Sequence, residues 1–276
     1  MATARKKATK KKDAVAKTKP GAVAVYDYGE NAGAGWETTT QEDFTVPRIK
    51  QLQSLSPECE EGGDAQVEGA KAGLFFNTVT KELLVDFNFI LVRREHVYVE
   101  WIPEDAGGGF VGVHQMDSPI VADAKANAVG RDLKTEAGND LIDTFEMCLG
   151  ILNEDGTEVD DFAMMSMTVT KQRPYRDMMT RLRTLKGSKS IPLFAHRQSM
   201  VTVKATSKSN KPYFNVEMPP LMDDTSASLL NPMDEGHRAI LDAARGFADG
   251  LASGEHKVKY DEPKTSKADD DTDEVF

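Results

Sequence analysis

With 276 residues, of which 39% are hydrophobic, the chain is long enough to bury the core of one domain of moderate size. Its net charge of −11 is unexpected for a protein that binds nucleic acid, unless the charge is segregated along the chain. No apolar run approaches the roughly 20 residues that span a bilayer, and Cys59 and Cys148 have no histidine at ligand spacing, so the sequence argues against a membrane-spanning helix, a zinc site and a disulfide framework.

Residues 1–42 are expected to form a basic disordered arm. The segment is rich in Lys, Ala, Gly and Thr and has no hydrophobic period of 2 or 3.6. Residues 1–20 carry eight basic side chains and one acidic one, without the apolar stretch of a secretory signal. Two interpretations stay open, because the arm either contacts phosphates or keeps the protein soluble. A reduced, cytosolic protein is predicted.

Residues 43–254 are expected to form the folded domain. At its start, Val46, Ile49 and Leu52 have helical spacing, which fits a short helix or an irregular lead-in. Residues 73–85 predict two short strands about a turn, and residues 87–102 predict one long strand rich in β-branched and aromatic side chains. Three consecutive glycines then break the pattern before a short strand over residues 110–113, and residues 117–139 are polar and weakly helical at most.

The second half of this domain predicts two hairpins and two helices. Residues 142–152 and 162–170 form the first hairpin about an Asp-Gly turn, and residues 199–205 and 213–218 form the second. A helix is expected to begin near Pro174 and end by Gly187, and another covers residues 231–251. Strands joined mainly by hairpins predict a mainly β fold with accessory α-helices, an OB-like antiparallel barrel rather than a βαβ-wound sheet.

The sequence carries no signature of catalysis. It contains no phosphate-binding loop, no Gly-x-Ser-x-Gly elbow and no His-Glu-x-x-His motif, and its five histidines are scattered. The acid pairs at 160–161 and 223–224 lie in or beside predicted turns, where solvation is a more common role than Mg²⁺ binding in a nuclease. We therefore expect a protein that is not an enzyme and that needs no cofactor or metal.

The clearest chemical feature is a basic block at residues 171–211, with eleven basic side chains and one acidic one. A turn of 100° per residue places Arg176 and Arg183 on the helix side opposite Tyr175, Met178 and Leu182. Such a stripe binds phosphates without reading sequence. The alternative is a solvated face that balances the acidic remainder. The expected phosphate contacts are Lys171, Arg173, Arg176, Arg183, Lys186, Lys189, Arg197 and Lys204.

Aromatic side chains are candidates for base stacking, which is worth ~1–3 kcal/mol per base. Strand alternation puts Tyr98 on one face and Val97, Val99 and Trp101 on the other, so we expect Tyr98 to be exposed and Trp101 to be buried. For any single ring, core packing is the alternative and the more common role. The candidate stacking residues are Tyr98, Phe110, Tyr175 and Tyr213.

Residues 255–276 are expected to form a flexible acidic tail with an apolar tip. Five of the last eight residues are acidic, and the chain ends in Val-Phe. A tethered segment of this kind is a peptide ligand, because its charges steer it to a basic patch and its ring fills a pocket. It can also compete with DNA for the basic block, and a random polar end is the alternative. The expected partner-binding residues are Asp269, Asp270, Asp271, Asp273, Glu274 and Phe276.

The tail resembles those of bacterial and tailed-phage single-stranded-DNA-binding proteins, which end in acids and a terminal Phe. The body is similar to a family of phage proteins found among replication genes and described as single-strand binders. The matching stretches are residues 43–58, 73–80, 99–103, 106–110 and 192–197.

The resemblance implies an OB-like core, a location in the host cytoplasm, and replication partners such as a polymerase or a helicase/primase. Sequence-independent binding of single-stranded DNA in phage replication and recombination is the expected function. One departure is the balance of −19 over residues 21–170, which is more acidic than a DNA-coating core needs. The alternative is a protein-interaction or virion-associated component without single-strand specificity. The oligomeric state stays open, with a homodimer as one alternative.

Overall fold

The protein is represented by a computed structural model, which describes residues 46–130, 132–207, 210–222 and 224–253. The expected arm at 1–42 and tail at 255–276 lie outside the described residues. Three helices are described: α1 (Pro119–Ala126), α2 (Gln172–Thr184) and α3 (Glu235–Ser253). The strands are β1 (Ile49–Gln51), β2 (Phe75–Asn77), β3 (Leu83–Leu84), β4 (Asp86–Ile102), β5 (Gly109–Gln115), β6 (Asp140–Leu152), β7 (Val159–Thr168), β8 (Arg197–Thr206) and β9 (Pro212–Glu217).

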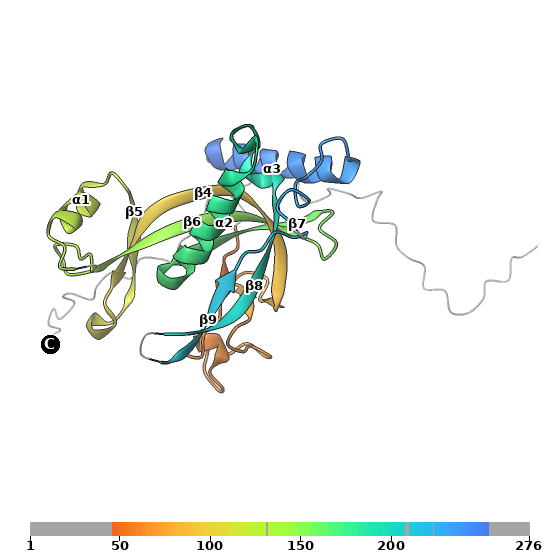
Figure 1. The fold of residues 1–276 in the computed structure, drawn as a ribbon. Helices are drawn as coiled ribbons and strands as arrows, with labels where there is room; N and C mark the ends of the chain where they lie inside the picture. Colours follow the sequence, from red (N-terminus) through yellow and green to blue (C-terminus); the bar gives the residue numbers. More distant parts are fainter. Residues whose placement is uncertain (1–45, 131, 208–209, 223, 254–276) are drawn as a thin grey trace, which may run out of the picture. The chain divides into compact units, whose positions relative to one another are not determined.

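These strands form two antiparallel sheets (Figure 1). The larger sheet has the order β7-β6-β4-β8-β9, with β5 paired to the far end of β4, and the smaller one has the order β1-β2-β3. The long strand β4 pairs with β5, β6 and β8, and its register shifts between Leu91 and Arg93 and between Glu100 and Trp101. Such bulges bend a strand and increase its twist. The fold is mainly β and curls into a half-barrel, so the predicted class is confirmed and is consistent with an OB-like barrel.

Both faces of the β4–β6–β7 region are covered. On one face, α2 packs Met178 and Leu182 against Phe89, Met147 and Met165. On the other face, α3 closes a second core that includes Ile90, Cys148, Met164, Ile240 and Ala244, and the rings of Phe162 and Phe247 stack with centroids 3.9 Å apart. Side chains on both faces of β6 are therefore buried, so the strand does not have one buried and one solvent-exposed face.

The predicted hairpins and the two long helices are confirmed, with shifts of a few residues at their ends. At the start of the domain, the structure has a strand where the sequence fitted a short helix or an irregular lead-in, so this prediction is wrong. Residues 49–51 form strand β1, in which Ile49 and Gln51 are buried while Lys50 is exposed, the period of a strand. The Gln51 side-chain amide donates to Thr202 Oγ1 and to the Asn215 carbonyl, both at 2.9 Å. Tertiary pairing therefore overrides the local helical spacing.

Cys59 and Cys148 are free thiols, and burial raises the pKa of Cys148 to about 12. In the part of the chain that the structure describes, no group of three or more His, Cys, Asp or Glu side chains is placed to hold a metal ion. No helix within the described ranges is long and apolar enough to cross a membrane.

Candidate nucleic-acid interface

Helix α2 separates a packing face from a cationic one. Tyr175, Met178 and Leu182 are buried, whereas Arg176 and Arg183 are exposed on the opposite side. Pro174 stands in the first turn, where a missing amide hydrogen is tolerated. The predicted division of the helix into two faces is therefore confirmed, while the contact of its arginines with DNA stays a prediction.

A cleft of about 570 Å³ runs along the cationic face of α2, and we call it the α2 cleft. Its described lining contains four basic side chains and no carboxylate, so an anion would meet no repulsion from the lining itself. Apolar side chains fill the space between the cations. The lining consists of Arg94, Phe145, Tyr175, Arg176, Met179, Thr180, Leu182, Arg183, Lys189, Ile191, Leu193 and His196.

Four rings form a ladder that ends at the α2 cleft. The ring centroids of Tyr98 and His96 are 6.3 Å apart, those of His96 and Phe145 are 4.2 Å apart, and those of Phe145 and Tyr175 are 4.5 Å apart, each pair at an interplanar angle of 26°. The Arg176 guanidinium lies 5.4 Å from the Phe145 centroid. The stacked rings therefore lie next to Arg176, whose guanidinium is attracted to the face of Phe145.

The charge of Arg176 in the α2 cleft is only weakly compensated. Arg176 lies 3.8 Å from the Asp143 carboxylate and donates a hydrogen bond to Gln172 Oε1 at 3.1 Å, yet 59% of its side chain is exposed. Exposed pairs of this kind contribute roughly 0–1 kcal/mol. Burial lowers the pKa of His196, which favours the neutral form of this lining residue. Burial also raises the pKa of Tyr175, an effect that the neighbouring Arg94 guanidinium partly offsets.

A second cavity, the β8–β9 groove, lies on the other flank of α2. It has a volume of about 1050 Å³ and contains Arg173, Arg181, Lys204 and Tyr213, but also Asp177 and Glu217. Arg181 is engaged within the fold, because it donates to Gln198 Oε1 and to the Met218 carbonyl. The groove has a larger volume than the α2 cleft, and its lining, unlike that of the cleft, contains carboxylates.

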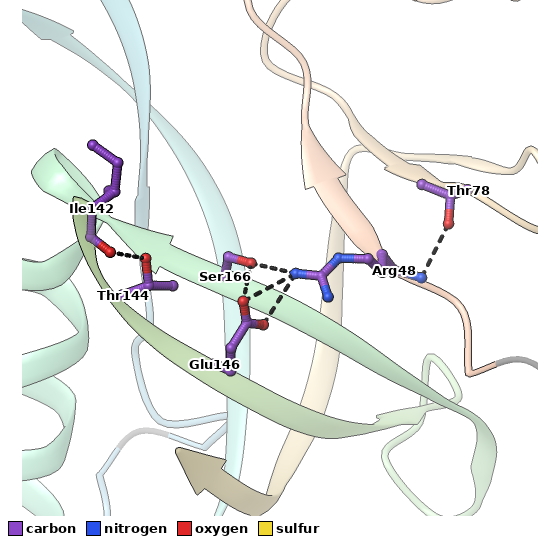
Figure 2. A network of polar contacts seen from close by, with 6 residues as sticks. All are labelled: Arg48, Thr78, Ile142, Thr144, Glu146 and Ser166. Carbon is purple, nitrogen blue, oxygen red and sulfur yellow. Dashed lines mark hydrogen bonds and ion pairs between the residues drawn. The ribbon is translucent and has the colours of Figure 1, made fainter. Parts of the chain in front are cut away.

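A third cavity, the Arg48 pocket, contains a buried ion pair (Figure 2). The Arg48 guanidinium donates to both carboxylate oxygens of Glu146, at 3.1 and 3.2 Å, and to Ser166 Oγ, which in turn donates to Glu146 at 2.7 Å. Glu146 is 1% exposed. Sequence reasoning missed this pair and Arg94. The signal was an acid within the otherwise apolar run Phe145 to Leu149, which predicts a specific partner because buried charges are normally paired.

The junction between β7 and α2 distributes the basic block over these three cavities. A single 3-10 turn, η5 (Val169–Lys171), joins the two elements, and Val169 has a φ of +44°. A β-branched residue in that region costs about 1–3 kcal/mol. Lys171 lines the Arg48 pocket, Arg173 the β8–β9 groove, and Arg176 the α2 cleft. The basic block is therefore not one continuous stripe.

Several expected contacts are corrected by burial. Arg197 is 6% exposed, and its guanidinium donates to the carbonyls of Gly156 and Ser228, so it stabilises loops and is not a surface cation. Tyr98, Phe110 and Tyr175 are 6%, 7% and 2% exposed and pack in cores, so the expectation that Tyr98 is exposed is wrong. None of the three rings presents an open face, and their contact with DNA stays a prediction.

The expectation for Trp101 is also wrong, since it is 38% exposed. Strand alternation puts Tyr98 and Trp101 on opposite faces as expected, but α1 covers the Tyr98 face. Trp101 stands beyond the register shift near the end of β4.

The remaining expected residues are placed as follows. Arg173, Lys186 and Lys204 are exposed, and Tyr213 is partly exposed in the β8–β9 groove. Lys189 is exposed and lines the α2 cleft. The tail residues Asp269, Asp270, Asp271, Asp273, Glu274 and Phe276 lie outside the described residues.

Comparison with known proteins gives one family. No curated protein and no solved structure matches the chain significantly. The family model described as "Pam3 phage gp34-like protein" matches residues 11–257, which is most of the chain and includes every described strand and helix. The chain therefore belongs to the family of Pam3 phage gp34-like proteins, and it is a phage protein.

Proposed function

We propose that this phage protein is a non-enzymatic binder of single-stranded DNA, that it binds without sequence preference through the α2 cleft, and that it acts in phage replication and recombination in the host cytoplasm. The observation that carries the proposal is a cleft whose described lining has four cations and no acid. Cations at this density bind phosphates irrespective of sequence.

The walls of the cleft favour a single strand over a duplex. Between its cations the cleft presents the partly exposed apolar side chains of Met179, Ile191 and Leu193. Unpaired bases offer apolar faces to such a surface, whereas a duplex keeps its bases stacked and presents mainly phosphates. Because Phe145 and Tyr175 are buried beneath the cations, they support the cleft and do not themselves offer an open stacking face.

Binding of a fluorescent dT oligomer is expected to be several-fold tighter than binding of a duplex of equal length, and to weaken steeply with salt. If the four cations of the α2 cleft each neutralise one phosphate, log K falls by about 3 per decade of salt, at roughly 0.7 per contact. Fluorescence anisotropy between 50 and 400 mM NaCl measures both quantities. Equal affinity for duplex and single strands, or a flat salt response, contradicts the proposal and favours a protein-interaction or virion role.

The tail is proposed to recruit replication proteins, such as a polymerase or a helicase/primase, and to compete with DNA for the cationic surface. Deleting residues 261–276 removes seven acids and two lysines and changes the net charge from −11 to −6. A short tether gives the tail an effective concentration on the order of millimolar at the cationic surface, so even a weakly binding tail would lower the affinity for DNA.

We expect this deletion to raise the affinity for dT oligomers several-fold at 50 mM salt and little at 400 mM, because screening shortens the range of exposed charges. Deleting Phe276 alone should leave DNA affinity unchanged and abolish capture of the partner. Unchanged DNA affinity of the shortened chain at both salt concentrations would show that the tail does not compete.

A further inference from the structure

The Arg48 pocket has the composition of a small-ligand site and lies apart from the α2 cleft. Its volume is about 330 Å³, within the range of ligand pockets. One wall is apolar and aromatic, with Trp101 and Phe110 packed edge to face at a centroid distance of 5.7 Å. The polar side chains of the lining are three cations, one carboxylate and four hydroxyls. The lining consists of Arg48, Ile49, Lys50, Thr78, Val99, Trp101, Phe110, Thr144, Glu146, Ser166, Thr168 and Lys171.

Most polar side chains that line the Arg48 pocket already form ion pairs or hydrogen bonds within the protein. Arg48 pairs with Glu146, and Lys50 pairs with Glu58, which is not part of the lining. Thr78 Oγ1 accepts a hydrogen bond from the Arg48 amide, and Thr144 Oγ1 donates to the Ile142 carbonyl. These bonds fix the wall before any ligand arrives, which lowers the entropic cost of binding.

Lys171 is the exception. It is partly buried, and no ion pair or side-chain hydrogen bond joins its ammonium to any described residue. Burial lowers the pKa of its ammonium. A desolvated ammonium without a carboxylate is costly unless an anion meets it. The strained Val169 lies between Thr168 and Lys171, both of which line the pocket. Strain of this kind is commonly retained at ligand sites.

The pocket is separated from the α2 cleft by the sheet itself. Phe145 of β6 lines the cleft, whereas its neighbours Thr144 and Glu146 line the pocket. Successive side chains of a strand point to opposite faces, so the two cavities open on opposite faces of β6. A ligand in the pocket therefore need not touch the cations of the cleft.

We propose that the Arg48 pocket binds one nucleotide, with a phosphate against Lys171 and Thr168 and the base against Trp101. The pocket contains both the Lys171 ammonium and the aromatic ring of Trp101. A nucleotide has the complementary groups, an anionic phosphate and an aromatic base. The same chemistry is offered by a free mononucleotide and by the phosphorylated end of a strand. The proposal does not depend on the function assigned to the α2 cleft.

Tryptophan fluorescence tests this site directly, because the chain has two tryptophans, Trp36 and Trp101, and Trp101 lines the pocket. With the full-length Trp36→Phe protein, dTMP and dAMP should quench Trp101 saturably. Thymidine and inorganic phosphate should each bind at least tenfold more weakly, since each supplies half of the contacts. Quenching by a 5′-phosphorylated dT oligomer, but not by its unphosphorylated form, assigns the pocket to strand ends, and quenching by mononucleotides alone assigns it to free nucleotide.

Lys171→Gln should weaken dTMP binding about tenfold or more, as expected for the loss of a charge-assisted hydrogen bond. The matched control is Lys186→Gln, because Lys186 belongs to the same basic block, is exposed and lines none of the three cavities. Arg176→Ala/Arg183→Ala should also leave dTMP binding unchanged.

Circular dichroism verifies the fold of each variant. If Lys171→Gln does not fold, Trp101→Leu replaces it, and equilibrium dialysis with labelled dTMP should show a several-fold loss. The proposal is overturned if no nucleotide or oligomer quenches Trp101 at millimolar concentration, if thymidine binds as tightly as dTMP, or if the folded variant used binds dTMP as the Trp36→Phe protein does.

Discussion

Replacing Arg176, Arg183 and Lys189 by Ala is expected to weaken the binding of a dT oligomer about a hundredfold at 0.1 M salt. All three side chains are exposed in the α2 cleft. At about 1 kcal/mol for each lost phosphate contact, the variant loses ~3 kcal/mol of binding free energy, which is roughly a hundredfold in Kd. The slope of log K against log salt should become shallower by about 2, at roughly 0.7 per contact. Anisotropy titrations in a salt series measure both changes.

The matched control is Arg173→Ala/Lys204→Ala, which removes two exposed cations from the β8–β9 groove on the other flank of α2. We expect it to lower the affinity less than the cleft variant does, and thermal unfolding of both should stay within about 2 °C of wild type because exposed side chains contribute little to stability. A larger loss from the groove variant would place the DNA path in the groove. If both variants bind the dT oligomer with wild-type affinity, the exposed cations of the α2 cleft and of the β8–β9 groove do not bind DNA.

Replacing Glu146 by Ala is expected to lower the free energy of unfolding by about 3 kcal/mol. The substitution leaves the Arg48 guanidinium without its carboxylate, and breaking a buried pair from one side costs about 3–5 kcal/mol. The lower value applies because 23% of the Arg48 side chain is exposed and water can partly solvate it. At 2–4 °C per kcal/mol for a domain of this size, Tm should fall by about 6–12 °C. Urea and thermal denaturation followed by circular dichroism measure the effect.

Two variants separate charge burial from the loss of packing. Ser166→Ala removes the hydrogen bonds of Ser166 with Arg48 and Glu146 but keeps the ion pair, and should cost about 1–2 kcal/mol. The double variant Arg48→Met/Glu146→Leu removes both charges and should recover most of the stability lost by Glu146→Ala, since apolar replacement of a buried pair is often neutral. If the free energy of unfolding of Glu146→Ala lies within about 1 kcal/mol of the wild-type value, the Arg48–Glu146 pair does not stabilise the fold as argued.

The strands and hairpins were predictable because their signals are local. Alternating β-branched residues, the Asp155-Gly156 turn and the apolar stripe of α2 act over a few residues, and the structure has the corresponding elements. The prediction for residues 46–52 was wrong because strand β1 forms by pairing with β2, which lies more than twenty residues further along the chain. Local spacing carries no information on such pairing.

The candidate site was predictable only in part. The cationic face of α2 followed from helical geometry, but the division of the basic block among three cavities depends on the turn at Val169, which no local pattern indicates. The alternation of side chains correctly predicted which residues share a face of β4. It could not predict that α1 would cover Tyr98 or that Arg197 would lie beneath two loops. Burial is a property of the whole fold, so exposure was the least predictable quantity.

The alternation along β6 has a consequence for how this gene can vary. Insertion or deletion of one codon within Thr144 to Cys148 would exchange the two faces of the strand, sending Glu146 into the Met147 core and Phe145 into the Arg48 pocket. Such a change would damage the core and both cavities at once. The loop at Asn153 to Glu158 lies just beyond the strand, so a change in its length would not exchange the two faces of β6. Among relatives, length differences should therefore collect in that loop and be absent from β6.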